Sequence, residues 1–163
     1  MSSCEPHIWY KDQPCFIQEQ IQQIKSDYTL YKSQNDWQNA LKCLDKLIAL
    51  GPHKEISFNQ QLHNKWCHCQ IKIGLDYWCD GNFDDSIKHM QQVIDKDLTF
   101  GAVPYYYIGV YHWFHHRNFK AIYYIEKASV LKPMVENYKQ HLITIINEVN
   151  NKYKYETNTK LYH

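Results

Sequence analysis

The sequence predicts an all-α fold, a solenoid of helical hairpins that repeat about every 34 residues. Three observations support this prediction: few turn-forming residues, apolar residues at helical spacing, and small residues at fixed offsets. The 163 residues include only five glycines and five prolines, which is few for a fold of many short strands and tight turns. A chain of this length is expected to form one domain with a sizeable core.

Two apolar stripes predict the first hairpin. Steps of four and three residues place one stripe on a single face of a helix over about 15–34, formed by Ile17, Ile21, Ile24, Tyr28 and Tyr31. Asn35-Asp36 supplies a turn and capping oxygens. The returning helix ends at Gly51-Pro52, and its stripe is formed by Trp37, Ala40, Leu44, Leu47 and Ile48.

Two further hairpins follow the same plan. A helix between Trp66 and Asp80 precedes a turn at Gly81-Asn82, and a returning helix begins at Phe83. The third hairpin starts at Pro104, which suits a first helical turn, and its first helix runs to His116. The partner helix begins near Asn118 and ends at Pro133.

Small residues recur at constant separations in these hairpins. Gly74 precedes Ser86 by twelve residues and Gly109 precedes Ala121 by twelve, while the two glycines are 35 residues apart. Where antiparallel helices cross most closely, only Gly, Ala or Ser lets the backbones approach. The separations therefore indicate an internal repeat.

These segments resemble tetratricopeptide repeats. The family pattern is matched in the third copy by Tyr105, Ile108, Gly109, Ala121, Ile125, Ala128 and Pro133. The second copy departs from it at Gln70 and Leu98, and the first has Asp27-Tyr28 where an apolar-small pair is expected. The resemblance implies a right-handed α-α superhelix with three repeats and a C-terminal capping helix.

The resulting layout is a single domain over 15–155, preceded by an N-terminal arm at 1–14. The repeats cover about 21–54, 67–100 and 102–135, and the insertion at 55–66 is either a longer loop or an extension of the next helix. A further apolar stripe predicts a capping helix at about 136–153, which would cover the apolar end of the solenoid. The tail at 156–163 is polar and is expected to fray.

Composition argues against several classes of partner. The formal net charge is +1 and Arg117 is the one arginine, so neither nucleic acid nor anionic lipid is an expected partner. The N-terminus does not resemble a signal peptide, and no apolar run approaches the roughly 20 residues of a membrane helix. We therefore expect a cytoplasmic protein whose six cysteines are reduced thiols.

Catalytic and metal-binding motifs are weak. His112 and His116 are four residues apart, but no nearby carboxylate or thiolate completes a metal site, and His112 is expected to replace a packing aromatic. Cys67 and Cys69 point about 200° apart on a helix, which favours packed thiols over chelation. No nucleophile motif or phosphate loop is present. The sequence predicts no enzyme, no catalytic residue, no cofactor and no metal.

The resemblance places a ligand groove on the first helix of each hairpin. By helical phase, the groove residues would be Lys25, His68, Ile71, Lys72, Leu75, Trp78, Tyr106, Tyr107, Val110, Trp113 and Phe114. An aromatic groove suits an apolar or amphipathic peptide or helix of another protein. The chain is thus predicted to be an adaptor or assembly subunit, although the sequence leaves the partner and the oligomeric state open.

Some members of this family grip the carboxylates of heat-shock proteins with a clamp of lysines, asparagines and an arginine. Lys25 matches one clamp position, but Thr29, Lys72, Val103 and Tyr107 replace the other donors, so no such clamp is expected. In an alternative hypothesis, the chain docks into a larger complex or oligomer through its end or its convex face, including Tyr123 and Tyr124. Its groove would then be filled by its own N-terminus through Ile8, Trp9, Tyr10 and Phe16.

Overall fold

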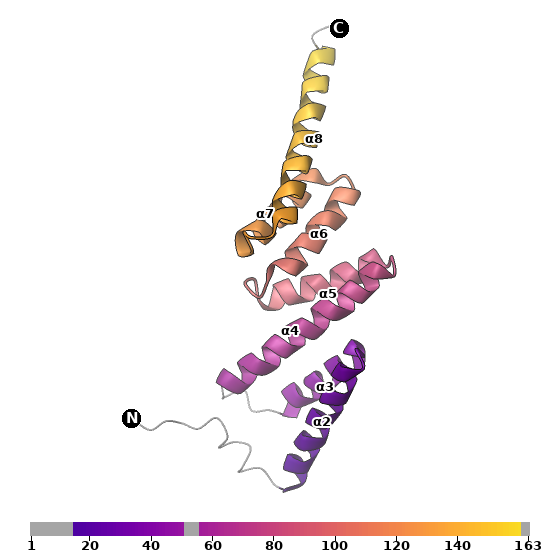
Figure 1. Ribbon diagram of the computed structural model, residues 1–163, viewed down its shortest axis with the longest axis vertical. Coiled ribbons are helices and arrows are strands. Elements are labelled where there is room, and N and C mark those ends of the chain that lie inside the picture. Colours follow the sequence, from indigo (N-terminus) through magenta and orange to yellow (C-terminus); the bar gives the residue numbers. More distant parts are fainter. Residues whose placement is uncertain (1–14, 51–55, 161–163) are drawn as a thin grey trace, which may run out of the picture. The chain divides into compact units, whose positions relative to one another are not determined.

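The computed structural model describes residues 15–50 and 56–160, and the side chains of 17–50 and 60–154 (Figure 1). The predicted N-terminal arm, Pro52 and residues 161–163 lie outside the described residues. Within the described ranges all regular structure is helical, which confirms the all-α prediction. The helices are α2 (Cys15–Ser33), α3 (Trp37–Leu50), α4 (Ile56–Cys79), α5 (Phe83–Lys96), α6 (Ala102–Phe114), α7 (Asn118–Leu131) and α8 (Glu136–Lys160).

Three helices are longer than the apolar stripes predict. The helix α4 begins ten residues before Trp66, so the segment predicted as an insertion is helical from Ile56 onward. The helix α6 begins at Ala102 rather than Pro104. Pro104 is tolerated in the first turn, because the backbone N–H that a proline lacks would have no helical partner there. The helix α8 continues to Lys160, into the segment predicted as a frayed tail, since no glycine or proline interrupts it.

The chain divides into two compact units, Met1–Ile73 and Gly74–His163. The boundary falls inside α4, so this helix supplies residues to both units. Each unit is described below by itself.

The three hairpin turns share one backbone geometry, so the repeat seen in the sequence is also present in the structure. Each turn has a residue with positive φ: Asn35 at 57°, Gly81 at 78° and His116 at 55°. The next residue donates its backbone N–H to a carbonyl of the last helical turn, with N···O distances of 2.9 Å in all three cases. This pattern is the Schellman motif, which ends a helix and satisfies its last carbonyl groups.

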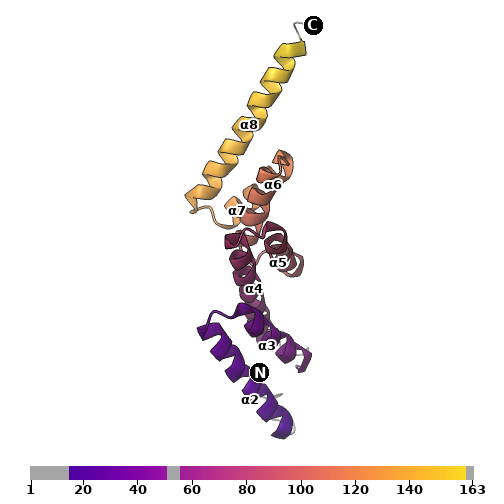
Figure 2. The ribbon, with the colours of Figure 1, turned by 90° about the vertical axis from the view of Figure 1, so that its right-hand side faces the viewer.

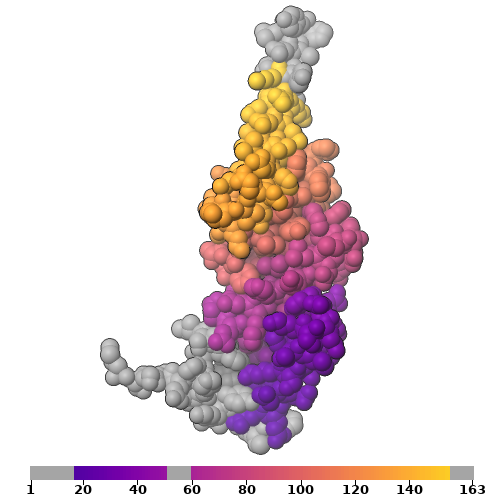
Figure 3. Space-filling view, in the orientation of Figure 1, coloured from indigo at the N-terminus to yellow at the C-terminus, as the bar shows by residue number. Residues whose placement is uncertain are grey.

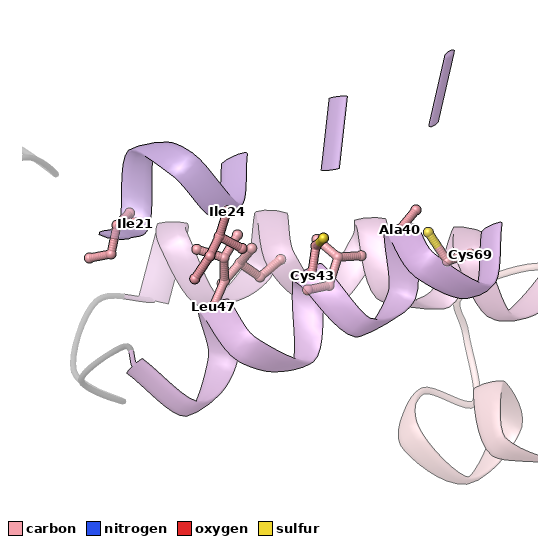
Figure 4. Packing of buried hydrophobic residues seen from close by; sticks show 8 residues of the cluster. Ile21, Ile24, Ala40, Cys43, Leu47 and Cys69 are labelled. Carbon is pink, nitrogen blue, oxygen red and sulfur yellow. The ribbon is translucent and has the colours of Figure 1, made fainter. Parts of the chain in front are cut away.

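The core of the first unit lies where α2, α3 and α4 meet (Figure 4). The helix α2 contributes Ile21 and Ile24, while α3 contributes residues that include Ala40, Leu44 and Leu47. The extension of α4 adds the buried Leu62 and the half-buried Trp66, whose indole N–H donates to Asp45 Oδ1 at 3.0 Å. The longer α4 therefore completes the first hydrophobic core.

The second unit is held together by close helix crossings at two glycines. A Cβ added to Gly109 would lie 2.5 Å from Ile125 Cγ1 and 3.1 Å from the backbone nitrogen of Ile125. A Cβ added to Gly74 would lie 2.9 Å from the terminal methyl of Met90. These glycines allow α4 to approach α5 and α6 to approach α7, as the small-residue repeat predicts.

The helix α8 packs on α6 and α7 through its first half. Ile145 is fully buried with Val110, Ala121 and Ile125, and Leu142 packs against this cluster. Beyond Val149 the described side chains of α8 are exposed. Figures 2 and 3 show this C-terminal part of the helix, in yellow, extending past α6 and α7.

Candidate functional site

A partly exposed aromatic cluster lies on the second unit. It is formed by the half-buried Trp78 of α4 and Tyr107 of α6 and by the exposed Phe83 of α5 and Phe114 of α6. The ring of Trp78 lies at the centre of the cluster, with centroid distances of 4.7 Å to Phe83, 4.9 Å to Tyr107 and 6.4 Å to Phe114. Phe114 is 60% exposed and Phe83 is 38% exposed. We call these four residues the aromatic surface.

The rings of the aromatic surface hold one another in place. Trp78 meets Phe83 and Tyr107 in edge-to-face geometry, with interplanar angles of 62° and 78°. Such pairs are favoured by the quadrupoles of the rings and reduce their rotamer freedom before any ligand binds. Burial is the main cause that raises the pKa of Tyr107, so its hydroxyl stays neutral at physiological pH.

A second group of predicted groove residues on α6 contacts α8. The hydroxyl of Tyr106 forms a hydrogen bond with His141 Nδ1 at 3.0 Å, and its ring packs on Tyr138 with centroids 4.5 Å apart. The indole N–H of Trp113 donates to Glu148 Oε2 at 2.8 Å. The first half of α8 therefore covers this part of the predicted groove from within the chain.

The first unit contains a different kind of surface, a cleft of about 360 Å³ between α2, α4 and the start of α3. Its lining combines lysine side chains with two aromatic rings. We call it the lysine cleft, and it is lined by Tyr28, Lys32, Trp37, Asn64, Lys65, His68, Cys69 and Lys72.

Two lysines of this cleft lie over aromatic rings. The Nζ atom of Lys65 is 5.4 Å from the centroid of Tyr28, and that of Lys72 is 5.8 Å from the centroid of Trp37. Lys25 lines a separate hollow on α2 with Ser26 and Thr29, and burial first and the charge of Lys65 second lower the pKa of its ammonium group. Burial is also the main cause that raises the pKa of the Cys69 thiol to about 11, so this cysteine stays protonated.

The predicted groove residues thus fall into separate groups. Trp78, Tyr107 and Phe114 form the aromatic surface, whereas Tyr106, Val110 and Trp113 pack against α8. His68 and Lys72 line the lysine cleft, whereas Lys25 lines a separate hollow on α2. Ile71 and Leu75 are half-buried on α4.

Several residues of these surfaces were missed by helical phase alone. The sequence predicts Phe83 only as the start of a returning helix, and Lys65 falls in the segment predicted as an insertion. Lys65, His68 and Lys72 are separated by three and four residues, which places them on one face of a helix. Extending the predicted helix by one turn toward the N-terminus would therefore have placed Lys65 beside His68. Tyr28 was noted as a departure from the repeat pattern, but that departure gave no reason to predict a cleft.

Of the residues considered for metal binding, His112, Cys67 and Cys69 are engaged in packing, whereas His116 is exposed in the turn after α6. The ring of His112 lies 5.5 Å from that of Tyr124, and burial is the main cause that lowers its pKa. Cys67 and Cys69 are both buried on α4, while His68 between them is exposed. Among the described residues, no three His, Cys, Asp or Glu side chains gather as metal ligands would.

A search for membrane-spanning segments, restricted to the described residues, found no helix with the length and apolar character to cross a bilayer.

Comparison of the chain with family models found no match. Comparison with curated proteins also found no match. Among solved structures, one similar fold is the C-terminal tetratricopeptide-repeat domain of an FK506-binding protein from Plasmodium falciparum, with 18% identity and a TM-score of 0.52. That alignment covers 89% of this chain and 99% of the other.

A second structure found is the first tetratricopeptide-repeat domain of Spaghetti (RPAP3) bound to an HSP90 peptide. It has 14% identity and a TM-score of 0.46, over 81% of this chain and 94% of the other. Because this chain and the Plasmodium domain are only 18% identical, their similarity, which extends over nearly the full length of both, is one of fold alone. This similarity and the three hairpin turns, each with a residue of positive φ, show that the chain has the fold of a tetratricopeptide-repeat domain.

Proposed function

We propose that this chain is a non-catalytic protein-interaction module that binds an apolar or amphipathic segment of another protein on its aromatic surface. The observation that carries the proposal is the exposure of Phe114, 60%, beside the interlocked rings of Trp78 and Tyr107. Burying an aromatic side chain at an interface gains much apolar contact for little loss of rotamer freedom. Because these rings already contact one another, ordering them on binding costs little more.

Contacts within the chain reduce the number of predicted groove residues that are available to a ligand. Tyr106 and Trp113, which the sequence predicts as ligand contacts, already hydrogen-bond to His141 and Glu148 of α8. A ligand that used them would have to displace these partners. The proposed binding residues are therefore Trp78, Tyr107, Phe114 and the neighbouring Phe83.

The proposal can be tested with peptides selected from a displayed library of amphipathic helices against the full chain. Phe114→Ala should weaken binding of the selected peptides by about tenfold or more, the effect of removing a hot-spot aromatic. Phe119→Ala is the matched control, since Phe119 is 68% exposed on the neighbouring helix α7 and lies outside the aromatic surface. Isothermal titration calorimetry would measure both variants.

Two results would contradict the proposal: a library that yields no binder of the wild-type chain, or binders whose affinity is indifferent to Phe114→Ala. The Phe114 side chain is exposed, so its loss should leave the fold intact. Circular dichroism of the variant would verify this.

A second candidate function is supported by an exposed stripe on α7. Phe119, Tyr123 and Val130 are 68%, 54% and 71% exposed and recur at helical spacing. This stripe suits docking of the chain into a larger complex or oligomer. A loss of affinity with Phe119→Ala, and none with Phe114→Ala, would favour this alternative.

A further inference from the structure

We infer that the lysine cleft of the first unit is a separate binding site for an acidic segment of a partner protein, in which carboxylates flank an apolar side chain. This site goes beyond the proposed function, because its residues and its ligand chemistry differ from those of the aromatic surface. The inference rests on the charge of the cleft, its apolar floor and the origin of the cleft in the repeat pattern.

The cleft exists where the first repeat breaks the small-residue rule. Tyr28 precedes Ala40 by twelve residues, so it occupies the position that Gly74 and Gly109 hold in the other repeats. Those glycines bring their helices into close contact, whereas the half-buried Tyr28 ring cannot fit such a crossing and lines the cleft instead. The departure that looks like a weak repeat therefore produces a concave surface.

Three lysines gather at this surface. Among the described residues, no carboxylate lies within ion-pair distance of Lys32, Lys65 or Lys72. The nearby acidic residues of the unit are engaged elsewhere: Asp27 accepts a hydrogen bond from Gln23, Asp36 from Asn39 and Asp45 from Trp66. Burial first and the charge of Lys65 second lower the pKa of Lys25, so these two ammonium groups of α2 and α4 repel each other. An anionic ligand would relieve this repulsion.

The floor of the cleft selects a peptide over a simple anion. Tyr28, Trp37 and the Cys69 thiol line it together with the aliphatic stems of the lysines. A volume of about 360 Å³ lies within the range of roughly 300–1,000 Å³ that ligand pockets occupy. An apolar side chain fits this floor, and carboxylates on either side of it can reach the ammonium groups at the rim.

Nucleic acid fits less well. Stacking of a base would need the ring faces of Tyr28 and Trp37, over which the Lys65 and Lys72 ammonium groups already lie. Each cation would have to leave its ring before a base could take that face. The net charge of +1 also provides little attraction for a polyanion beyond the cleft itself.

The test uses the full chain and a labelled hexapeptide in which two acidic residues flank Leu-Phe on each side. Both ends are capped, so that no terminal carboxylate contributes. Fluorescence anisotropy should detect binding at low salt that weakens as the salt concentration rises. The triple variant Lys32→Gln, Lys65→Gln, Lys72→Gln should lose at least about tenfold in affinity, because three charge contacts are removed.

A second triple variant, Lys46→Gln, Lys120→Gln, Lys132→Gln, is the matched control. It removes the same charge from exposed lysines outside the cleft, and its affinity should stay within about twofold of wild type. Equal losses in both variants would mean that only net charge matters, which would overturn the inference. A wild-type chain that fails to bind the hexapeptide at low salt would overturn it too, including the case in which the chain's own N-terminus fills the cleft.

Two further measurements distinguish this site from an RNA site and from the aromatic surface. A single-stranded oligouridylate that binds more tightly than the hexapeptide and is lost in the cleft variant would assign the site to RNA and overturn the peptide inference. The Phe114→Ala variant should bind the hexapeptide like wild type. The cleft variant should likewise keep its affinity for the amphipathic peptides, so failure of one site would be distinguished from failure of the other.

Discussion

Gly109 lies where α6 and α7 cross, and the atoms around it leave no room for a side chain. A methyl group there would meet Ile125 Cγ1 at 2.5 Å, the Ile125 backbone nitrogen at 3.1 Å and the carbonyl of Ala121 at 3.3 Å. Two of these atoms belong to the backbone of α7, so they cannot rotate away. At Gly74 the shortest contact, 2.9 Å, is with the end of the flexible Met90 side chain, and the backbone carbonyl of Ser86 lies at 3.3 Å.

This difference predicts unequal effects of the same substitution. Gly109→Ala should lower the free energy of unfolding by about 1–2 kcal/mol. The backbone contacts place the overpacking cost in the upper part of the usual range of about 1–3 kcal/mol, and better helix propensity offsets about 1 kcal/mol. Gly74→Ala should cost less than Gly109→Ala, since Met90 can move and the backbone contact with the Ser86 carbonyl, at 3.3 Å, is less severe than the overlap with Ile125. Urea denaturation of both variants would measure the difference, and a Gly74→Ala variant as unstable as Gly109→Ala would show that the crossing at α4 and α5 is equally rigid.

Tyr28 shows how one residue changes the type of surface that a repeat presents. At the equivalent positions, Gly74 and Gly109 serve helix packing alone, whereas the Tyr28 ring lines a cleft and carries the Lys65 ammonium group over its face. The sequence pattern marks Tyr28 as a departure. Its role depends on Lys65 and Trp37, which come from two other helices.

At the scale of the element, α8 has one face packed against its neighbours and another face exposed. One face packs on α6 and α7 through Tyr138, Leu142 and Ile145, while Ile143 and Ile146 remain exposed. Polar contacts from His141 and Glu148 to Tyr106 and Trp113 fix its register. These contacts close one side of the groove that the apolar residues of α6 predict.

Matched isoleucines test this docking. Ile145 is fully buried and Ile143 is 52% exposed on the same helix. Ile145→Ala should lower the free energy of unfolding by about 2–5 kcal/mol, as for other buried isoleucines, while Ile143→Ala should change it by about 0.5 kcal/mol or less. Thermal unfolding followed by circular dichroism would compare the two, and equal small losses would contradict a packed α8.

At the scale of the whole molecule, the two units have separate hydrophobic cores. The cluster around Leu44 belongs to α2, α3 and the first part of α4. The cluster around Ile125 belongs to α6, α7 and α8, with Trp78 from the end of α4 packed against it, and the two clusters share no residue. In repeat proteins stability is approximately a sum of local terms between neighbours. Damage to one core should therefore spread little to the other.

Hydrogen exchange can measure this independence. Ile125→Val should cost about 0.5–1.5 kcal/mol and should speed the exchange of protected amides in α6, α7 and α8. Amides of α2 and α3 should exchange as in wild type, because their core is untouched. A uniform acceleration across α2 to α8 would instead mean that both units unfold as one cooperative body.

The sequence predicts the hairpin turns well and the helix ends less well, for a physical reason. Turns depend on local chemistry, such as the positive φ that Gly81 readily adopts. The start of α4 depends on Leu62 and Trp66 finding a core made by other helices, so the local pattern underestimates the helix by ten residues. The end of α8 was missed because a polar helical segment shows no apolar stripe.

The sequence by itself determined that this protein is a set of three helical hairpins with close crossings at Gly74 and Gly109, because helical period, turn chemistry and small-residue spacing are local properties. Only the tertiary structure decided which aromatic residues are available. Tyr106 and Trp113 are engaged by α8, whereas Phe114 is exposed. It also decided that Lys32, Lys65 and Lys72 share one cleft. Both depend on contacts between helices distant in sequence, and a stripe on one helix does not specify which partner will cover it.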